Sequence, residues 1–229
     1  MEATQFRAIA ARFNYLAADC PDLMFSTKEV CREMSSPTTR SHEKLKRLAR
    51  YLMGVAEVKF YYRWQSEMSE LSVFVDSDWA GCRRTRRSTS GGCMMLGLHT
   101  LRAWSTTQST VAMSSAEAEY YALVEGAVRS IGLQSMMKQL GLDVQILLLT
   151  DSSAAKSFSS QRGLSRMRHL EVKDLWLQEA ICRNRLKIGR VRGDANPADL
   201  FTKYHNSTEV EAQCSRMNME VVKSEKSRK

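Results

Sequence analysis

A short apolar strand pattern in this chain ends directly at two acidic residues. Leu71, Val73 and Val75 recur at every second position, which is the period of a β-strand with one buried face. Asp76 and Asp78 follow at once. An ionised carboxyl group at the end of a buried strand costs free energy unless it is paired or binds a metal ion. A strand that leaves the core into a polar loop explains one such acid equally well, so acids elsewhere in the chain decide the interpretation.

Composition limits the class of protein. The chain has 229 residues, 43% of them hydrophobic, which suits one medium domain or a small domain with an appendage. No stretch approaches the roughly 18 apolar residues that cross a bilayer, and the N-terminus lacks a signal-peptide layout, so we expect no membrane partner. The six cysteines include no C-x-x-C pair, which argues against a zinc site and a disulfide scaffold. The net charge of +9 favours a polyanionic partner, although many basic proteins have none.

Helical patterns dominate the first part of the chain. Apolar residues recur with helical spacing over residues 4–18, 23–34 and 42–53. The third predicted helix carries a basic face, which is either solvated or in contact with phosphate groups. Residues 55–64 are typical of a strand, and the polar residues 65–70 mark a predicted domain boundary.

Strand and helix patterns alternate in the rest of the chain. Ser114 and Glu117 have the spacing of a capping box and predict a long helix that runs to about Gln139. Asn196 and Pro197 predict the start of a last helix. The other predicted elements are strands at residues 93–98, 101–106, 144–150 and 186–191, a turn at 99–100, and helices at 152–158 and 169–181.

Three more acids occupy positions comparable with that of Asp76. Glu119 shares the i, i+4 row of the long helix with Leu123, and this row points toward the core unless the first turn projects past it. Asp151 ends the most apolar strand pattern, and open sheets place ligand groups at the carboxyl ends of their strands. Asp199 lies at the third position of the last helix, where the helix dipole alone favours an acid.

Taken together, Asp76, Glu119, Asp151 and Asp199 can meet at one edge of a sheet. Four negative charges in one cluster repel each other strongly unless divalent cations neutralise them. Carboxylate oxygens are hard ligands, which select magnesium or manganese. The set therefore predicts a metal site.

Several longer blocks carry a family resemblance. They read Asp76-Ser-Asp-Trp-Ala-Gly, Arg87-Ser-Thr-Ser-Gly, Trp104-Ser, Gln108-Ser-Thr-Val-Ala-Met-Ser-Ser-Ala-Glu-Ala-Glu-Tyr120 and Ala198-Asp-Leu-Phe-Thr-Lys203. In this order they resemble the ribonuclease H domain of copia-type retrotransposon Pol polyproteins over about residues 71–203. The preceding part, with Pro21-Asp22 and residues 45–54, resembles the thumb region that ends the reverse transcriptase of that family. The polymerase's paired-Asp strand motif does not occur, so we expect no polymerase activity from this chain alone.

The resemblance implies a fold and a domain layout. The fold is α/β (α+β mixed sheet) and ribonuclease H-like, with a mixed sheet flanked by helices and preceded by a small helical N-terminal segment. The predicted domains are a thumb-like helical segment at residues 1–66, a ribonuclease H-like domain at 67–205 and a polar, basic, disordered tail at 206–229. The expected location is the cytoplasm, in an element-derived particle, or the nucleus.

The resemblance also implies an activity. It implies an endoribonuclease that hydrolyses the RNA strand of RNA–DNA hybrids and uses two Mg²⁺ or Mn²⁺ ions. The four ligands carried over by motif are Asp76, Glu119, Asp151 and Asp199. The expected partners are the hybrid and the remainder of the Pol polyprotein.

Other residues in the matching blocks receive weaker assignments. Asp78 and Glu117 are expected to be bystanders or outer-sphere residues. His169 stands where the family has a Lys-His dipeptide, and a core or helix-capping role is the simpler interpretation. The residues expected to contact the nucleic-acid backbone, which position the substrate without reading its sequence, are Arg83, Arg84, Arg86, Arg87, Ser88, Ser105 and Gln108.

Two rival interpretations stay open at this point. The chain can be an inactive or domesticated fragment that acts only as a nucleic-acid-binding module, or a purely structural fragment. Cys82 and Cys93 depart from the family pattern and leave room for both. Retention of all four acids argues against both, because a cluster of uncompensated carboxylates is destabilising.

Overall fold

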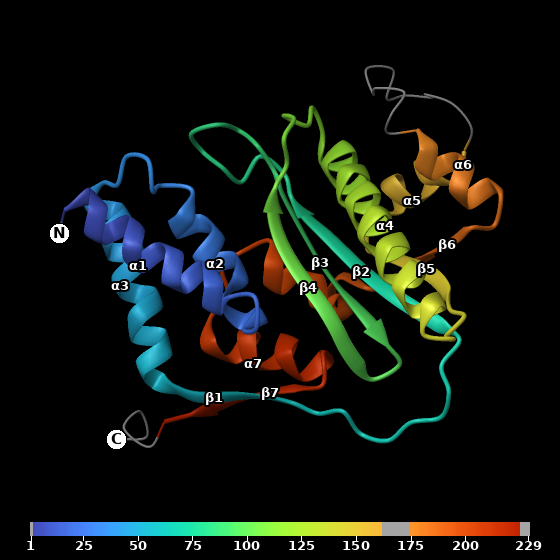
Figure 1. Cartoon of the computed structure of the whole chain (residues 1–229). Helices are drawn as coiled ribbons and strands as arrows, with labels where there is room; N and C mark the ends of the chain where they lie inside the picture. Colours follow the sequence, from blue (N-terminus) through green and yellow to red (C-terminus); the bar gives the residue numbers. More distant parts are fainter. Residues whose placement is uncertain (1, 162–174, 225–229) are drawn as a thin grey trace. The chain divides into compact units, whose positions relative to one another are not determined.

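The computed structural model describes residues 2–161 and 175–224 (Figure 1). The chain divides into two compact units. The first unit combines both ends of the chain, Met1–Tyr61 and Lys203–Lys229, and the second is Tyr62–Thr202.

A five-stranded mixed sheet forms the centre of the second unit. Its strands lie in the order β4-β3-β2-β5-β6. β2 is antiparallel to β3 and parallel to β5, and β5 is parallel to β6. This arrangement confirms the predicted α/β class, a mixed sheet flanked by helices. The strand bounds are β2 Glu70–Asp78, β3 Thr89–Leu96, β4 His99–Thr107, β5 Gln145–Thr150 and β6 Leu186–Arg190.

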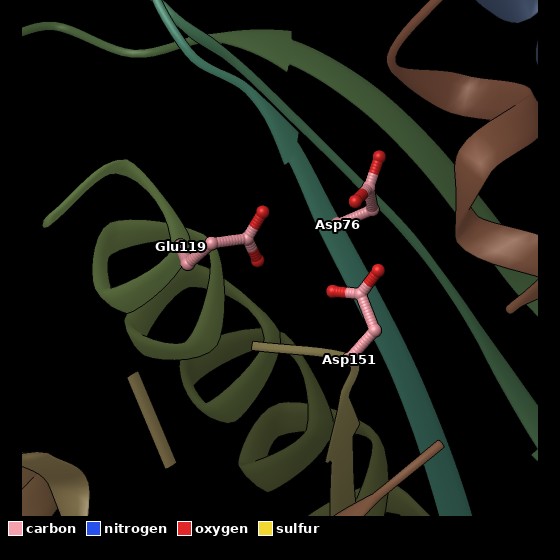
Figure 2. A group of neighbouring side chains, drawn as sticks. All are labelled: Asp76, Glu119 and Asp151. Atoms are coloured by element: carbon pink, nitrogen blue, oxygen red, sulfur yellow. The ribbon is translucent and has the colours of Figure 1, made fainter. Parts of the chain in front are cut away.

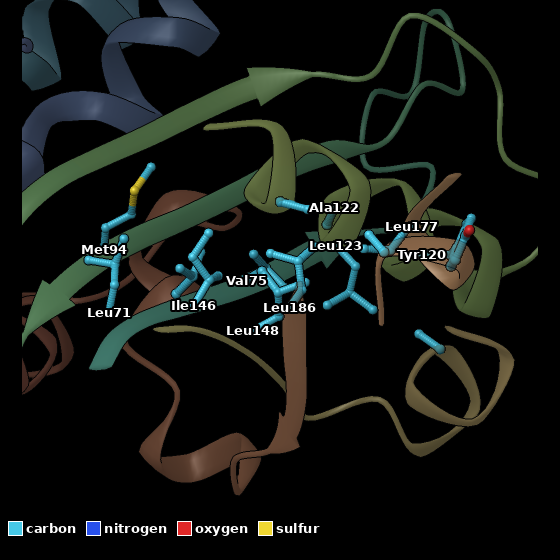
Figure 3. Close-up of a cluster of buried hydrophobic side chains, with 14 of the residues drawn as sticks. Leu71, Val75, Met94, Tyr120, Ala122, Leu123, Ile146, Leu148, Leu177 and Leu186 are labelled. Atoms are coloured by element: carbon cyan, nitrogen blue, oxygen red, sulfur yellow. The ribbon is translucent and has the colours of Figure 1, made fainter. Parts of the chain in front are cut away.

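One face of the sheet is covered by helices that share its main hydrophobic core. They are α4 (Ser115–Gln139), α5 (Ser153–Ser159) and α6 (Trp176–Cys182). Figure 3 shows side chains of this core, where Leu123 of α4 meets Val75 and Leu148 of the two central strands. Burial of these apolar surfaces is the main favourable term that holds α4 on the sheet.

Local signals in the sequence account for several boundaries in this unit. The side chain of Ser114 accepts a hydrogen bond from the backbone N–H of Glu117 at 3.2 Å, as the capping pattern predicts. The turn between β3 and β4, however, lies at residues 97–98 and not at 99–100. Gly97 has a φ of +59° there, a conformation that glycine adopts without steric cost.

The last predicted helix of this unit is a short 3-10 helix, η3 (Pro197–Phe201). Asn196 caps it as expected, because its side-chain oxygen accepts a hydrogen bond from the N–H of Ala198 at 3.1 Å. The predicted helix at residues 169–181 corresponds in part to α6, and its beginning lies outside the described residues.

The described part of the first unit consists of helices α1, α2, α3 and α7 and the two-stranded sheet of β1 and β7. The predicted helices of the N-terminal part are confirmed as α1 (Ala3–Leu16), α2 (Pro21–Cys31) and α3 (Thr39–Gly54). Their shared core includes Phe6, Phe13, Leu23, Val30, Leu45 and Leu48. β1 (Val55–Phe60) pairs with a strand from the other end of the chain.

The C-terminal segment differs from the loose tail that its polar composition predicts. Residues 206–223 form helix α7 (Ser207–Arg216) and strand β7 (Met219–Lys223), and β7 is antiparallel to β1. Asn206 and Glu209 form a reciprocal capping box, and Cys214, Met217 and Met219 are buried. Three buried side chains therefore offset the polar composition that suggested disorder. Among the described residues, no helix is long and apolar enough to cross a membrane.

Replacing Asn206 with alanine should loosen α7. The variant removes the acceptor for the N–H of Glu209, now at 2.9 Å, and N-cap losses of this kind cost about 1 kcal/mol. Amide hydrogen exchange within α7 should accelerate roughly fivefold for that loss of stability. Asn206→Asp keeps the acceptor and is the matched control. Unprotected amides in wild-type α7 would support the loose tail instead.

Candidate metal centre

Three carboxylates converge at the edge of the sheet in the second unit. Asp76, Glu119 and Asp151 each contribute an oxygen, and these atoms all lie within 4.8 Å of one another. Figure 2 shows their carboxyl groups turned toward one another from three different elements. Asp76 and Glu119 are buried, and Asp151 is half-buried.

Parallel pairing of the two central strands brings two of the acids together. In the register of β2 and β5, Phe74 lies opposite Leu149. Asp76 and Asp151 each come two residues later, so Asp76, near the end of β2, and Asp151, just after β5, lie at the carboxyl ends of adjacent parallel strands. Glu119 comes from the first turns of α4, whose apolar row fixes the helix on the sheet. Strand pairing and helix packing therefore bring the three carboxylates together.

The two oxygens of Glu119 have different surroundings. Oε1 accepts hydrogen bonds from the backbone N–H of Ser77 at 3.1 Å and from its hydroxyl at 3.0 Å. Oε2 is buried and has no hydrogen-bond partner in the described part of the chain. A buried acceptor without a donor is costly, and such a group needs a specific explanation. A cation among the three carboxylates provides one.

The electrostatics of the cluster agree with this geometry. Burial, followed by the negative charges of Asp76 and Asp151, raises the pKa of Glu119 to about 8. The hydrogen bonds from Ser77 oppose that shift because they stabilise the ionised form. The hydrogen bonds from Ser77 therefore do not offset the cost of ionising Glu119 in this cluster.

A divalent ion fits the donor set. All three ligand groups are carboxylates, the hard oxygen donors that Mg²⁺ and Mn²⁺ prefer. Oε2 of Glu119, to which no described residue donates, offers such an ion an acceptor. The described cysteines are scattered free thiols that do not join the cluster, so it resembles no zinc site.

The fourth predicted acid takes a different position. Among the described residues, Asp199 is not part of the converging group. It lies in η3, and its backbone carbonyl accepts hydrogen bonds from the N–H and the hydroxyl of Thr202, both at 3.2 Å. The same Thr202 hydroxyl donates to Oδ2 of Asp76. Asp199 thus connects to the cluster through its backbone, and its role as a ligand stays a prediction.

Asp78 and Glu117 lie outside the converging group as well. The carboxylate of Asp78 folds over Gly81, where a Cβ atom would lie only 1.8 Å from Oδ2. Oε2 of Glu117 accepts a hydrogen bond from the N–H of Met113 at 2.8 Å, at the start of α4. The first contact lies in the turn that follows β2, and the second lies at the start of α4. The predicted His169 lies outside the described residues.

Comparison with known proteins finds several relatives of the chain. No family model matches it. It is 38% identical over 122 residues to an uncharacterized mitochondrial protein of Arabidopsis thaliana, an alignment that covers 53% of this chain and 50% of that protein. It is 26% identical over 205 residues to the retrovirus-related Pol polyprotein from transposon RE1 of the same plant, which covers 88% of this chain and 14% of the polyprotein. Pol polyproteins of copia-type retrotransposons are therefore among the homologues of the chain.

The match covers only a segment of those polyproteins. The chain spans about half the length of the mitochondrial relative and 14% of the RE1 polyprotein. Among solved structures, the chain is similar to LC11-RNase H1, isolated from compost by a metagenomic approach. That similarity has a TM-score of 0.42 and 17% identity, and it covers 59% of this chain and 94% of that chain.

Two of the predicted nucleic-acid contacts in this Pol segment are corrected by the structure. Ser88 is fully buried and accepts a hydrogen bond from the N–H of Ala80 at 3.0 Å. Gln108 is buried and donates to the Ser90 hydroxyl and to a backbone carbonyl of α4. Their block of hydroxyl and amide residues predicted exposure, but these side chains satisfy interior polar groups. Ser105 is half-buried, and its hydroxyl donates to the carbonyl of Phe201 at 2.5 Å.

The predicted arginine run lies on the surface of the Pol segment. The four side chains of Arg83, Arg84, Arg86 and Arg87 are all exposed, in a loop between β2 and β3. The loop is closed by two backbone hydrogen bonds between Cys82 and residues 86 and 87, at 2.7 and 3.2 Å. A closed loop presents these charges at the same edge of the sheet as Asp76, because it follows β2 directly.

Ser77 and Thr202 are functional candidates that sequence reasoning missed. Each donates to a carboxylate of the cluster. Ser77 directly follows Asp76, and Thr202 comes three residues after Asp199. This proximity to predicted ligands is the signal in the sequence that could have identified both residues. Hydroxyl residues are common beside acids, so the pattern alone does not separate a donor from a solvated side chain.

Replacing Glu119 with glutamine should stabilise the metal-free protein at pH 8. An unfolded glutamate releases its proton near pH 4.5, whereas folded Glu119 retains it up to about pH 8. Wild-type stability therefore declines as the pH rises from 4.5 to 8, and a neutral glutamine avoids this loss. In EDTA, E119Q should be more stable than wild type at pH 8 by an amount on the order of a few kcal/mol. The difference should vanish toward pH 4.5.

Denaturant titration at pH 5 and pH 8 measures this difference. Glu125→Gln is the matched control on the same helix, because Glu125 pairs with Arg129 at 2.8 Å outside the cluster. That variant should gain nothing at pH 8. Equal stability of E119Q and wild type at both pH values would show that the cluster does not hold Glu119 protonated.

Proposed function

We propose that this Pol segment is an endoribonuclease that hydrolyses the RNA strand of RNA–DNA hybrids with two Mg²⁺ or Mn²⁺ ions. The observation that carries the proposal is the convergence of Asp76, Glu119 and Asp151 within 4.8 Å. A group of three carboxylates, two of them buried, is costly for the fold without a partner and binds divalent cations well. Similarity to retrotransposon Pol polyproteins supports the same reaction, because the matching blocks resemble the ribonuclease H part of such a polyprotein.

The residues of the centre have separate tasks in this proposal. When bound, divalent ions activate a water molecule and neutralise charge on the leaving oxygen. Asp76, Glu119 and Asp151 hold them, and Ser77 fixes the orientation of the Glu119 carboxylate by two hydrogen bonds. Asp199 is proposed as a fourth ligand, since η3 lies against the strand that carries Asp76.

Recognition of the substrate rests on backbone contacts. The RNA strand of a hybrid differs from DNA by its 2′-hydroxyl groups, which proteins contact through polar groups in the minor groove. The exposed arginines of the loop after β2 are proposed to contact phosphates, because phosphate contacts position a nucleic acid without reading its sequence. The net charge of +9 favours such a polyanion.

The first unit is proposed to be the end of the reverse transcriptase thumb. Its helices α1, α2 and α3 occupy the residues that resemble that region. The partner of this unit is then the remainder of the Pol polyprotein. Because α7 and β7 belong to the same unit, the thumb-like part includes residues from both ends of the chain.

Replacing Asp151 with asparagine should abolish hydrolysis and leave the fold intact. The amide keeps the shape of the side chain but removes a charge that holds the cation, so the rate should fall by more than about 100-fold. Loss of one negative charge also relieves repulsion in the metal-free protein, so its melting temperature should stay equal or rise. The assay uses a labelled RNA–DNA hybrid with Mg²⁺, with Mn²⁺ and with EDTA.

Asp143→Asn is the matched control for that assay. Asp143 is exposed and precedes the other end of the same strand, β5, so its loss should leave the rate unchanged. Cleavage in EDTA, equal cutting of single-stranded RNA, or a wild-type rate in D151N would overturn the proposed nuclease. Hybrid binding without any cleavage by the wild type would favour the nucleic-acid-binding module.

Replacing all four loop arginines with alanine should weaken hybrid binding and flatten its salt dependence. Each lost phosphate contact removes about 0.7–0.9 from the slope of log K against log salt concentration. Binding is measured by fluorescence anisotropy at several salt concentrations with Ca²⁺ in place of Mg²⁺. The double variant Arg183→Ala, Arg185→Ala removes exposed arginines elsewhere in the second unit and should leave the slope nearly unchanged. An unchanged slope in the fourfold variant would remove the loop from the interface.

A further inference from the structure

Thr202 contacts the proposed metal centre from the sheet face opposite α4. Its hydroxyl donates to Oδ2 of Asp76, and the side chain is fully buried. Alternation along β2 directs Val75 toward the helical core and Asp76 to the other side. Thr202 follows η3 and reaches Asp76 on that second side.

A row of three residues on adjacent strands seats the segment that carries Thr202. Asp76 lies opposite Gly91, and Gly91 lies opposite Ser105. We call these three residues the anchoring row. A Cβ atom on Gly91 would lie 2.6 Å from Cβ of Phe201 and 2.7 Å from Cγ2 of Thr202, so the close approach requires glycine.

The other members of the row hold the same segment by hydrogen bonds. The Ser105 hydroxyl donates to the carbonyl of Phe201 at 2.5 Å, and Thr202 donates to Asp76. At the start of η3, the side-chain amide of Asn196 donates to the backbone carbonyl of Val75 at 3.0 Å. The segment is therefore fixed at both ends on the strand that carries Asp76.

We infer that Thr202 is a positioning residue that sets the orientation of the Asp76 carboxylate for a divalent cation. This inference rests on the proposed function, because it assumes that Asp76 is a metal ligand. A hydrogen bond from a neutral hydroxyl to an ionised carboxylate is stronger than one to a neutral acceptor. It restricts rotation of the carboxyl group, so the ion does not have to order the ligand when it binds.

An alternative, purely structural role for Thr202 is to cap the end of η3. Its hydroxyl also lies 3.2 Å from the carbonyl of Asp199, which it can cap at the end of η3. A cap affects the stability of the segment but does not act on a ligand. Metal affinity, compared between a variant that lacks the hydroxyl and one that retains it, therefore separates the two roles.

The test measures the affinity of the full chain for Mn²⁺ by isothermal titration calorimetry. Thr202→Val keeps the volume of the side chain and removes the hydroxyl, and it should bind Mn²⁺ about tenfold more weakly, as is typical for the loss of an outer-sphere partner. Thr202→Ser retains the hydroxyl and should bind within about twofold of wild type. If T202V does not fold, Thr202→Ala gives the same comparison with a smaller side chain.

Thr106→Val is the matched control. Thr106 also donates to a carboxylate, that of Glu125 at 2.8 Å, but this pair lies outside the acidic cluster. T106V should bind Mn²⁺ as wild type does. Hydrolysis of the hybrid should follow the same order, with T202V slowed and T202S restored.

The other possible results show which of the two hypotheses, the positioning role of Thr202 or the proposed nuclease, is wrong. Wild-type affinity in T202V or T202A overturns the positioning role and leaves the nuclease intact. Equal weakening in T202S and T202V assigns the effect to the methyl group and also overturns the role. Absence of Mn²⁺ binding in the wild type overturns the proposed function together with this inference.

Discussion

Repulsion among three carboxylates at a buried sheet edge is the constraint on which the second unit depends. Asp76, Glu119 and Asp151 are brought within 4.8 Å by strand pairing and helix packing that the core itself dictates. A buried charge is tolerated only when partners or a cation compensate it. The protein supplies donors to Glu119 and Asp76, yet the pKa of Glu119 still rises to about 8. Ionising Glu119 therefore has an electrostatic cost, which the proposed divalent ion would lower.

Two adjacent glycines of β3 allow structure to approach both faces of the sheet next to this edge. A Cβ atom on Gly92 would lie 2.3 Å from the ring of Trp104, on the face that α4 covers. One on Gly91 would meet Phe201 and Thr202 on the other face. Because β3 has no side chains at these two positions, neighbouring elements pack directly against its backbone. In β3, Gly92 thus allows close packing in the hydrophobic core, and Gly91 allows Thr202 to approach Asp76.

Local patterns predict the elements of this chain, and long-range contacts explain what they miss. Periodicity and capping identify β2 and α4, and the apolar row of α4 predicts that Glu119 is buried, as observed. The burial of Ser88 and Gln108 and the order of α7 depend on partners distant in sequence. Polar residues favour surface or tail positions on average, and only tertiary contacts reverse that preference.

The same distinction explains why three of the four acids converge and why Thr202 escaped prediction. Asp76 and Asp151 lie at the carboxyl ends of two parallel strands, so the register of these strands brings them together. Thr202 and Asp76 are 126 residues apart in the sequence. They come into contact because Gly91 has no side chain that would clash with Phe201 and Thr202. Fixed donors such as Ser77 and Thr202 orient a carboxylate but cannot cancel its charge. Orientation is therefore a property of the folded chain, whereas neutralisation requires a cation, and the two can be disturbed separately by removing a hydroxyl or a charge.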